Sequence, residues 1–243
     1  MQNFQHPLRV AVTTLALSFA AFVQPAAADD YKDCAQLSGD PALEACTRGI
    51  NSGRHQGKDL ALLYYNRAFE LEQKNELKRA VEDLNQSVRI NPTDAKAYHN
   101  RALILERLKD NDGAFADYNR AIERGSDHKS YGNRGVLFAR KKDYPKAIAD
   151  YDKAISINPK YAIAYYNRGI AYENRNNDDQ AIKDYSSAIQ NNPRYAQALN
   201  NRGLIYKKRG DRDRAIADFR LALEINPNFE LARKNLEELG VKP

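Results

Sequence analysis

A short motif, Asn-Arg followed by Ala or Gly, recurs along the chain at almost constant spacing and constrains its fold more than any other feature. Successive copies lie 34, 33, 34 and 34 residues apart. Twelve residues after each Ala or Gly comes an Ala, a large apolar residue follows four later, and a small residue three after that. Spacings of three and four place side chains on one face of a helix. Each period therefore predicts two α-helices, and the motif's Asn residues are Asn66, Asn100, Asn133, Asn167 and Asn201.

The repeat boundaries follow from the same spacing. In the clearest copy we expect a first helix over 162–175 and a second over 178–190. An Asn-Pro pair follows the second helix in four copies, because proline cannot continue a helix. Residues 230–243 are interpreted as an amphipathic helix and tail that cap the last repeat. The five repeats are predicted at 61–94, 95–127, 128–161, 162–195 and 196–229.

These residues resemble the tetratricopeptide repeat family. The segment Ala164–Tyr172 is similar to the family's first helix, and Ala181–Ile189 to its second. The resemblance covers about residues 61–229. It implies an all-α fold, a right-handed α-solenoid of five helix-turn-helix repeats whose first helices line a concave groove. Repeat 95–127 departs from the pattern, since it is one residue short and ends without Pro, so we expect a different turn there.

The N-terminal residues 1–28 have the pattern of a secretory signal peptide. His6 and Arg9 precede an apolar run of 14 residues from Val10 to Val23, and Ala26–Ala28 offers a small-residue cleavage site. A membrane-spanning helix needs about 20 apolar residues, so this run is too short to be one. We expect an exported protein, periplasmic or secreted, without an integral membrane span.

The two cysteines, Cys34 and Cys46, both lie just after this segment. In an exported protein such a pair predicts a disulfide, with two buried free thiols as the alternative. Residues 40–50 have the spacing of a second helix, and the first helix around Cys34 is short. Residues 29–60 are therefore interpreted as a degenerate N-terminal helical half-repeat held by the disulfide.

Every repeat carries an Arg in its first helix and an Asp in its second, both next to core positions. A guanidinium can hold a carboxylate with two parallel hydrogen bonds, so we expect ion pairs that join the two helices. The alternative is a series of five anion-binding sites. The pairs are Arg67 with Asp83, Arg101 with Asp117, Arg134 with Asp150, Arg168 with Asp184, and Arg202 with Asp218.

The recurring Asn residues are expected to face the groove. Packed helices lie about 8–10 Å apart and an extended chain rises about 3.3 Å per residue, so each repeat could bind a ligand backbone about every third residue. The alternative is that each Asn bonds the backbone of the neighbouring repeat. The residues before three of them, Tyr65, His99 and Tyr166, are expected to offer side-chain pockets or to pack against the next repeat.

Charge and motifs narrow the function. The formal charge is +6, but the 38 basic and 32 acidic residues are interspersed, whereas a nucleic-acid binder would concentrate Lys and Arg. No G-x-S-x-G, H-E-x-x-H or metal-ligand spacing occurs, so we predict no enzyme, no cofactor and no metal site. The prediction is a scaffold that binds an extended peptide or protein segment. The alternatives are a self-assembling homo-oligomer module or an activator subunit of an envelope-biogenesis complex.

Overall fold

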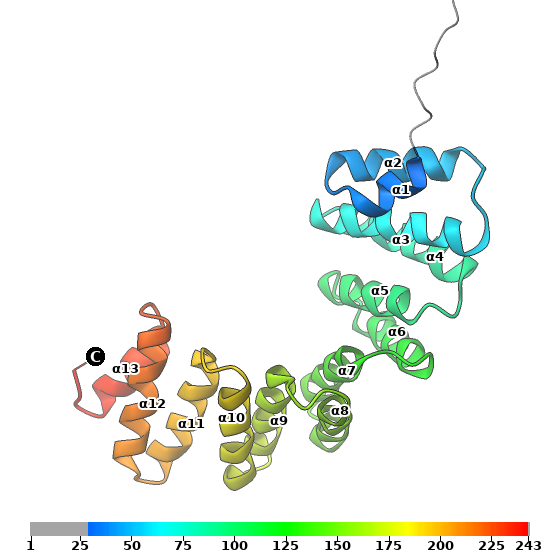
Figure 1. Ribbon diagram of the computed structural model, residues 1–243. Helices are drawn as coiled ribbons and strands as arrows, with labels where there is room; N and C mark the ends of the chain where they lie inside the picture. Colours follow the sequence, from blue (N-terminus) through cyan, green and yellow to red (C-terminus); the bar gives the residue numbers. More distant parts are fainter. Residues whose placement is uncertain (1–28, 243) are drawn as a thin grey trace, which may run out of the picture.

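The computed structural model describes residues 29–242, which form 13 α-helices and no strand (Figure 1). The predicted all-α solenoid is confirmed: helices follow one another along an arc, and each packs mainly on the next. The predicted signal peptide, residues 1–28, lies outside the described residues. In Figure 1, α5 and α7 lie nearer the inside of the arc than their partners α6 and α8.

The helices pair as the period predicts. In the repeat 162–195 the observed ends differ from the predicted ones by one residue at each C-terminus. The N-terminal unit contains α1 (Asp30–Gln36) and α2 (Asp40–Asn51), and α13 (Glu230–Glu238) closes the C-terminal end. The repeats are α3 (Gly57–Gln73) with α4 (Leu77–Ile90), α5 (Ala95–Arg107) with α6 (Asn111–Glu123), α7 (His128–Arg140) with α8 (Tyr144–Ile157), α9 (Ala162–Asn174) with α10 (Asp178–Asn191), and α11 (Ala196–Lys208) with α12 (Arg212–Ile225).

The turn inside every repeat uses one left-handed residue at the same place. Non-glycine residues fill four of these positions, with φ between 58° and 67°, and glycine fills the last with φ 77°. A residue in this conformation ends a helix and lets its backbone N–H groups reach the final carbonyls. The residues are Asn75, Lys109, Lys142, Asn176 and Gly210.

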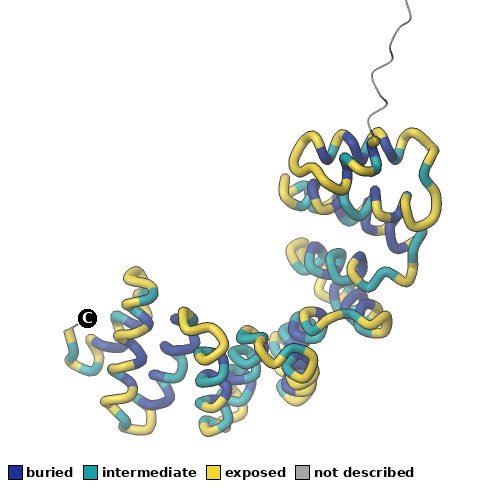
Figure 2. The backbone as a smooth tube through the Cα atoms, in the orientation of Figure 1, coloured by how far each residue is buried: buried dark blue, intermediate teal, exposed yellow. Residues whose placement is uncertain are grey.

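A large side chain of each second helix packs on a small residue of the first. Tyr151 and Tyr185 are fully buried in this position. A Cβ added to Gly135 or Gly169 would lie 2.7 Å from the ring of the corresponding tyrosine, so these glycines are required for the close approach. Figure 2 shows buried residues along the contacts between helices and exposed residues at the turns.

The short repeat does end in a different turn, as expected. Helix α6 stops at Glu123, and the chain turns through Gly125 at φ 79°. The backbone N–H of Ser126 bonds to Ala121 O at 3.0 Å, and its hydroxyl lies 2.5 Å from the hydroxyl of Ser130 in α7. With one residue fewer and no proline, the chain reaches α7 by a tighter path.

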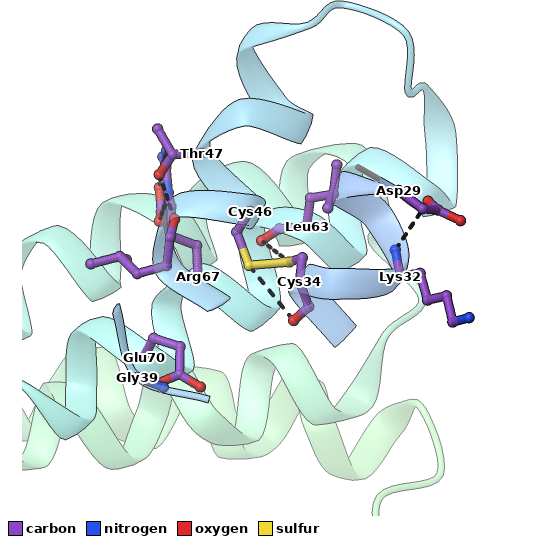
Figure 3. Close-up of a disulfide and its surroundings, with 11 residues drawn as sticks. Asp29, Lys32, Cys34, Gly39, Cys46, Thr47, Leu63, Arg67 and Glu70 are labelled. Atoms are coloured by element: carbon purple, nitrogen blue, oxygen red, sulfur yellow. Dashed lines mark hydrogen bonds and ion pairs between the residues drawn. A yellow bond between two sulfur atoms is a disulfide. The ribbon is translucent and has the colours of Figure 1, made fainter. Parts of the chain in front are cut away.

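The N-terminal unit contains two helices joined by the Cys34–Cys46 disulfide (Figure 3). The first of them, α1, is short, with 7 residues against 12 in α2. Cys46 lies in α2 between Ala42 and Gly49, at the spacing that places a large residue in the other second helices. The disulfide therefore replaces the contact of a large side chain with a small residue.

Helix α3 begins at Gly57, four residues before the predicted repeat boundary, which adds one turn. This turn follows Gln56, where the extended backbone starts the helix without a side-chain cap. Several contacts join the N-terminal unit to α3. Among them, Arg67 donates to the Thr47 hydroxyl at 3.4 Å, and Gly39 N–H donates to the buried Glu70 at 2.8 Å (Figure 3).

Candidate functional site

Each of the five repeats forms its predicted Arg–Asp pair. Nε and Nη2 of each Arg donate to the two carboxylate oxygens of its Asp, at 2.5–2.9 Å. The Asp side chains are only 2–8% exposed and the Arg side chains 12–20%. Because these donors are already used within the repeat, the arrangement favours the structural interpretation over five anion sites.

Each guanidinium also reaches the preceding repeat, which sequence reasoning did not predict. Its Nη1 donates to a side chain of the preceding second helix at 2.5–3.4 Å. One Arg thus joins three helices, so its contacts lie between neighbouring repeats as well as within one repeat. The acceptors, in chain order, are Thr47, Asn85, Asn119, Asp152 and Ser186.

The Asn row divides into two kinds of position. Asn100 donates to the hydroxyl of Tyr65 at 2.8 Å, and Asn201 to that of Tyr166 at 3.4 Å. Each bond joins the first helices of two consecutive repeats. The partner is a side chain, so the alternative of a bond to the neighbouring backbone does not apply to these two residues.

The two central Asn residues lack a tyrosine partner in the preceding repeat, because His99 and Gly132 occupy the corresponding places. Asn133 lies by the Tyr118 hydroxyl and lowers the pKa of that group, which burial raises more strongly. Between residues 29 and 242, Asn167 makes no side-chain hydrogen bond, and neither does Asn66. Asn133 and Asn167 therefore keep amide groups that a ligand could bind.

An apolar row accompanies the Asn row and was missed in the sequence. Its members follow each Asn by three residues, about one helical turn, so both rows lie on one face of the first helices. Phe69 is 49% exposed and the other four are partly exposed. The signal that could have revealed the row is the same period of 34, 33, 34 and 34. Its members are Phe69, Leu103, Val136, Ile170 and Leu204.

The face that carries these two rows has two edges, one at the C-terminal ends of the first helices and one at their N-terminal ends, and the charged residues at the two edges differ. Near the C-terminal ends of the first helices, Arg107 bonds Glu72 at 2.9 Å and Arg140 bonds Glu106 at 2.7 Å. Near the N-terminal ends, Lys96 and Lys129 are exposed, and no ion pair of theirs occurs within residues 29–242. The second edge thus retains two ammonium groups for a ligand.

A cavity of about 590 Å³ opens between α5 and α7. It brings together four of the eight predicted groove residues, while Tyr166 and the remaining Asn residues lie outside it. Its wall also includes Tyr161, Leu103 and the two lysines at the edge. The predicted residues that it unites are Tyr65, His99, Asn100 and Asn133.

The cavity exists because of the residue that precedes each first helix. Before α9, α11 and α13 this residue is aromatic: Tyr161, Tyr195 or Phe229. Tyr195 packs on Tyr166 with ring centroids 4.8 Å apart and fills the groove beside it. Before α5 and α7 the residue is Asp94 or Asp127, whose carboxylate instead accepts hydrogen bonds from the first helical N–H groups. The groove is therefore left open beside His99.

His99 lies in the cavity wall and is fixed by a polar chain. Its Nδ1 is hydrogen-bonded to the Ser130 hydroxyl at 2.7 Å, which in turn contacts Ser126. Burial lowers the pKa of His99, with a smaller opposing effect from Asp127. The imidazole is therefore held neutral near pH 7, and its Nδ1 side is committed to the protein.

Within residues 29–242, no group of three or more His, Cys, Asp and Glu side chains is arranged to hold a metal ion. None of the helices found there is long and apolar enough to cross a membrane.

The sequence matches profiles described as "Tetratricopeptide repeat" over residues 65–129, 162–195 and 196–229, and one described as "TPR repeat" over 135–175. No curated protein matches the chain. These profiles together span most of the solenoid, from the first repeat to the last.

Solved structures with the same fold include three TPR-like proteins. YrrB, "a TPR protein with an unusual peptide-binding site", is 22% identical, with TM-score 0.65 over 81% of this chain and 100% of that one. PilW, a "type IV pilus biogenesis factor", is 20% identical, with TM-score 0.65 over 74% and 86%. MamA from Desulfovibrio magneticus RS-1 is 19% identical, with TM-score 0.62 over 70% and 96%. With its matching profiles and its solenoid of paired helices, this chain belongs to the tetratricopeptide repeat family.

Proposed function

We propose that this protein is an exported, non-enzymatic scaffold that holds an extended segment of a partner protein along the face formed by its first helices. The observation that carries the proposal is the pair of parallel rows on this face. One row offers the amides of Asn133 and Asn167, which no tyrosine of the preceding first helix occupies, although Asn133 also lies by the Tyr118 hydroxyl of α6. The other offers apolar side chains one helical turn away.

The two rows suit a peptide chain in complementary ways. An Asn amide both donates and accepts, so it can bind a peptide group regardless of the side chain that follows. Apolar side chains such as Val136 and Ile170 provide contact area for the ligand's own side chains. The groove would thus tolerate many sequences through the backbone and select among them through side-chain contacts.

Export is supported by two independent features. The sequence pattern of residues 1–28 is typical of a signal peptide. Cys34 and Cys46 form a disulfide, which persists in oxidising compartments and is rare in the cytosol. YrrB and PilW, described above as a peptide-binding protein and a pilus biogenesis factor, are consistent with peptide binding and an envelope location as analogies.

Selection from a random peptide library on immobilised residues 29–243, followed by hydrogen exchange of the complex, tests this proposal. We expect enriched peptides that slow exchange in α5, α7 and α9 and leave α6, α8 and α10 unchanged. Failure to enrich any peptide, or protection confined to the second helices, would contradict the proposal that the first helices bind a peptide. Light scattering at the same concentrations separates this function from self-assembly, since a scaffold of this kind can bind as a monomer.

A further inference from the structure

We propose that the cavity between α5 and α7 is the anchoring pocket of the groove, and that it takes an aromatic side chain of the bound segment with an acidic residue beside it. The inference rests on the proposed function and specifies its ligand. Three features support it: the aromatic ring that later repeats place here and this one does not, the residues of the cavity walls, and the charges at the cavity edge.

The protein itself indicates what fits in the space. At the equivalent place in the following repeats, the rings of Tyr161 and Tyr195 lie against the preceding first helix. Tyr161 lies over Gly132, where an added Cβ would be 3.1 Å from the ring, and Tyr195 packs on Tyr166. At α7 the corresponding residue is Asp127, which caps the helix at 3.0 Å from the Lys129 N–H. A ligand's ring can occupy the position that the protein fills with its own ring elsewhere.

The walls favour an aromatic group over a purely polar one. Tyr65 and Tyr161 supply rings, and Leu103 of the apolar row also lines the cavity. Aromatic pairs contribute to binding beyond the area that they bury. The polar atoms nearby are largely committed, since Tyr65 accepts from Asn100 and His99 is bonded to Ser130. The volume of about 590 Å³ is within the usual range of ligand pockets and leaves room for residues beside the ring.

The edge of the cavity selects the charge. Lys96 and Lys129 flank it, both exposed and without an ion pair among the described residues. The two carboxylates nearby, Asp94 and Asp127, accept from the N–H groups that start α5 and α7. A glutamate or aspartate next to the aromatic residue would meet both ammonium groups. Such exposed pairs contribute mostly to orientation and association rate, and salt weakens them.

The test uses a residue that the protein already carries elsewhere. Asp127→Tyr restores the ring found before α9 and α11 and should fill the cavity, while Asp127→Ala removes the same cap without filling it. The library-selected peptide should bind Asp127→Tyr at least about tenfold more weakly than wild type, the size of a lost anchor residue. Asp127→Ala should bind as well as wild type or slightly better, because a negative charge is removed. Thermal unfolding of both variants controls for the lost cap.

Two further comparisons test the chemistry of the ligand. Peptides enriched on wild type should share an aromatic residue with an adjacent acid, and this enrichment should disappear on Asp127→Tyr. Lys96→Ala combined with Lys129→Ala should weaken binding several-fold at low salt and little at high salt, whereas Lys153→Ala on α8 should have no effect.

Contrary results separate this inference from the function beneath it. Enriched peptides that protect the first helices but share no aromatic residue, or that bind Asp127→Tyr normally, would refute the anchoring pocket. The proposal that the groove binds a peptide would still stand. If no peptide is enriched on folded wild-type protein, both fail.

Discussion

Arg168 in α9 donates two hydrogen bonds to Asp184 in α10, at 2.7 and 2.8 Å, and a third to Asp152 in α8 at 2.5 Å. One guanidinium thus joins both helices of its own repeat to the repeat before it. The same geometry recurs at all five Arg positions, so each Arg joins the helices of its own repeat and contacts the unit before it.

Replacing Asp184 with Ala should destabilise the protein without changing the groove. The guanidinium would keep only Asp152, whose side chain is 52% exposed. Removing one partner of a buried pair costs about 3–5 kcal/mol, and this partly exposed pair should fall at or below the lower end. Urea unfolding measures the loss, and Asp152→Ala is the matched control with an expected cost under about 1 kcal/mol. Equal unfolding midpoints for Asp184→Ala and wild type would refute the structural role.

The disulfide should stabilise the N-terminal unit. Cys34 and Cys46 are 12 residues apart, and closing a loop of this length contributes about 3 kcal/mol in the chain-entropy model. The double variant Cys34→Ala, Cys46→Ala should therefore lose helical structure in α1 and α2 first, as measured by hydrogen exchange. A reductant should lower the melting temperature of wild type but leave that of the double variant unchanged. An identical response of both proteins would contradict this assignment.

Stability should depend on pH through His99. Burial lowers its pKa below the ordinary 6.5, so between these two values the unfolded chain binds more protons than the folded one. The contribution of His99 to the free energy of unfolding should therefore be complete above about pH 6.5, and it should be lost as the pH drops toward the folded pKa. His99→Gln removes this dependence, and the difference between its urea midpoints and those of wild type from pH 7.5 to 5 isolates the effect. A constant difference across that range would argue against a buried neutral imidazole.

Export predicts a processed chain. Intact mass spectrometry of the protein from its native compartment should give a polypeptide that begins at Asp29, with Cys34 and Cys46 oxidised. A cytoplasmic product that retains Met1 would overturn the assignment to the envelope or the exterior.

The repeat in the sequence was sufficient to predict the helices, because the small residues and the large ones they contact recur at a fixed interval. It could not predict the extra turn of α3, since Gly57–Leu60 have no counterpart in the other repeats. Nor could it separate the bound Asn residues from the free ones. That difference depends on which side chain the preceding repeat places opposite, Tyr65 for Asn100 but Gly132 for Asn167.

The cavity was missed for a related reason. The cavity is open because the residue before α7, Asp127, is not aromatic. Asp127 taken by itself does not show that an aromatic ring is missing there. The signal is the residue before each first helix, which is aromatic in some repeats and Asp in others. Its meaning is clear only once the packing of Tyr195 on Tyr166 is known. The residues at this position are Asp94, Asp127, Tyr161, Tyr195 and Phe229.

The most direct test of a groove that binds the peptide backbone is a fluorescence anisotropy titration of the selected peptide against Asn133→Ala, Asn167→Ala. Each lost hydrogen bond is worth about 0.5–1.5 kcal/mol, so the double variant should bind several-fold to a hundredfold more weakly, with a melting temperature close to that of wild type. Asn191→Ala, on the second helix α10, should bind normally. A double variant that unfolds, while its folded fraction binds with wild-type affinity, would show that these residues belong to the scaffold and that the ligand binds elsewhere.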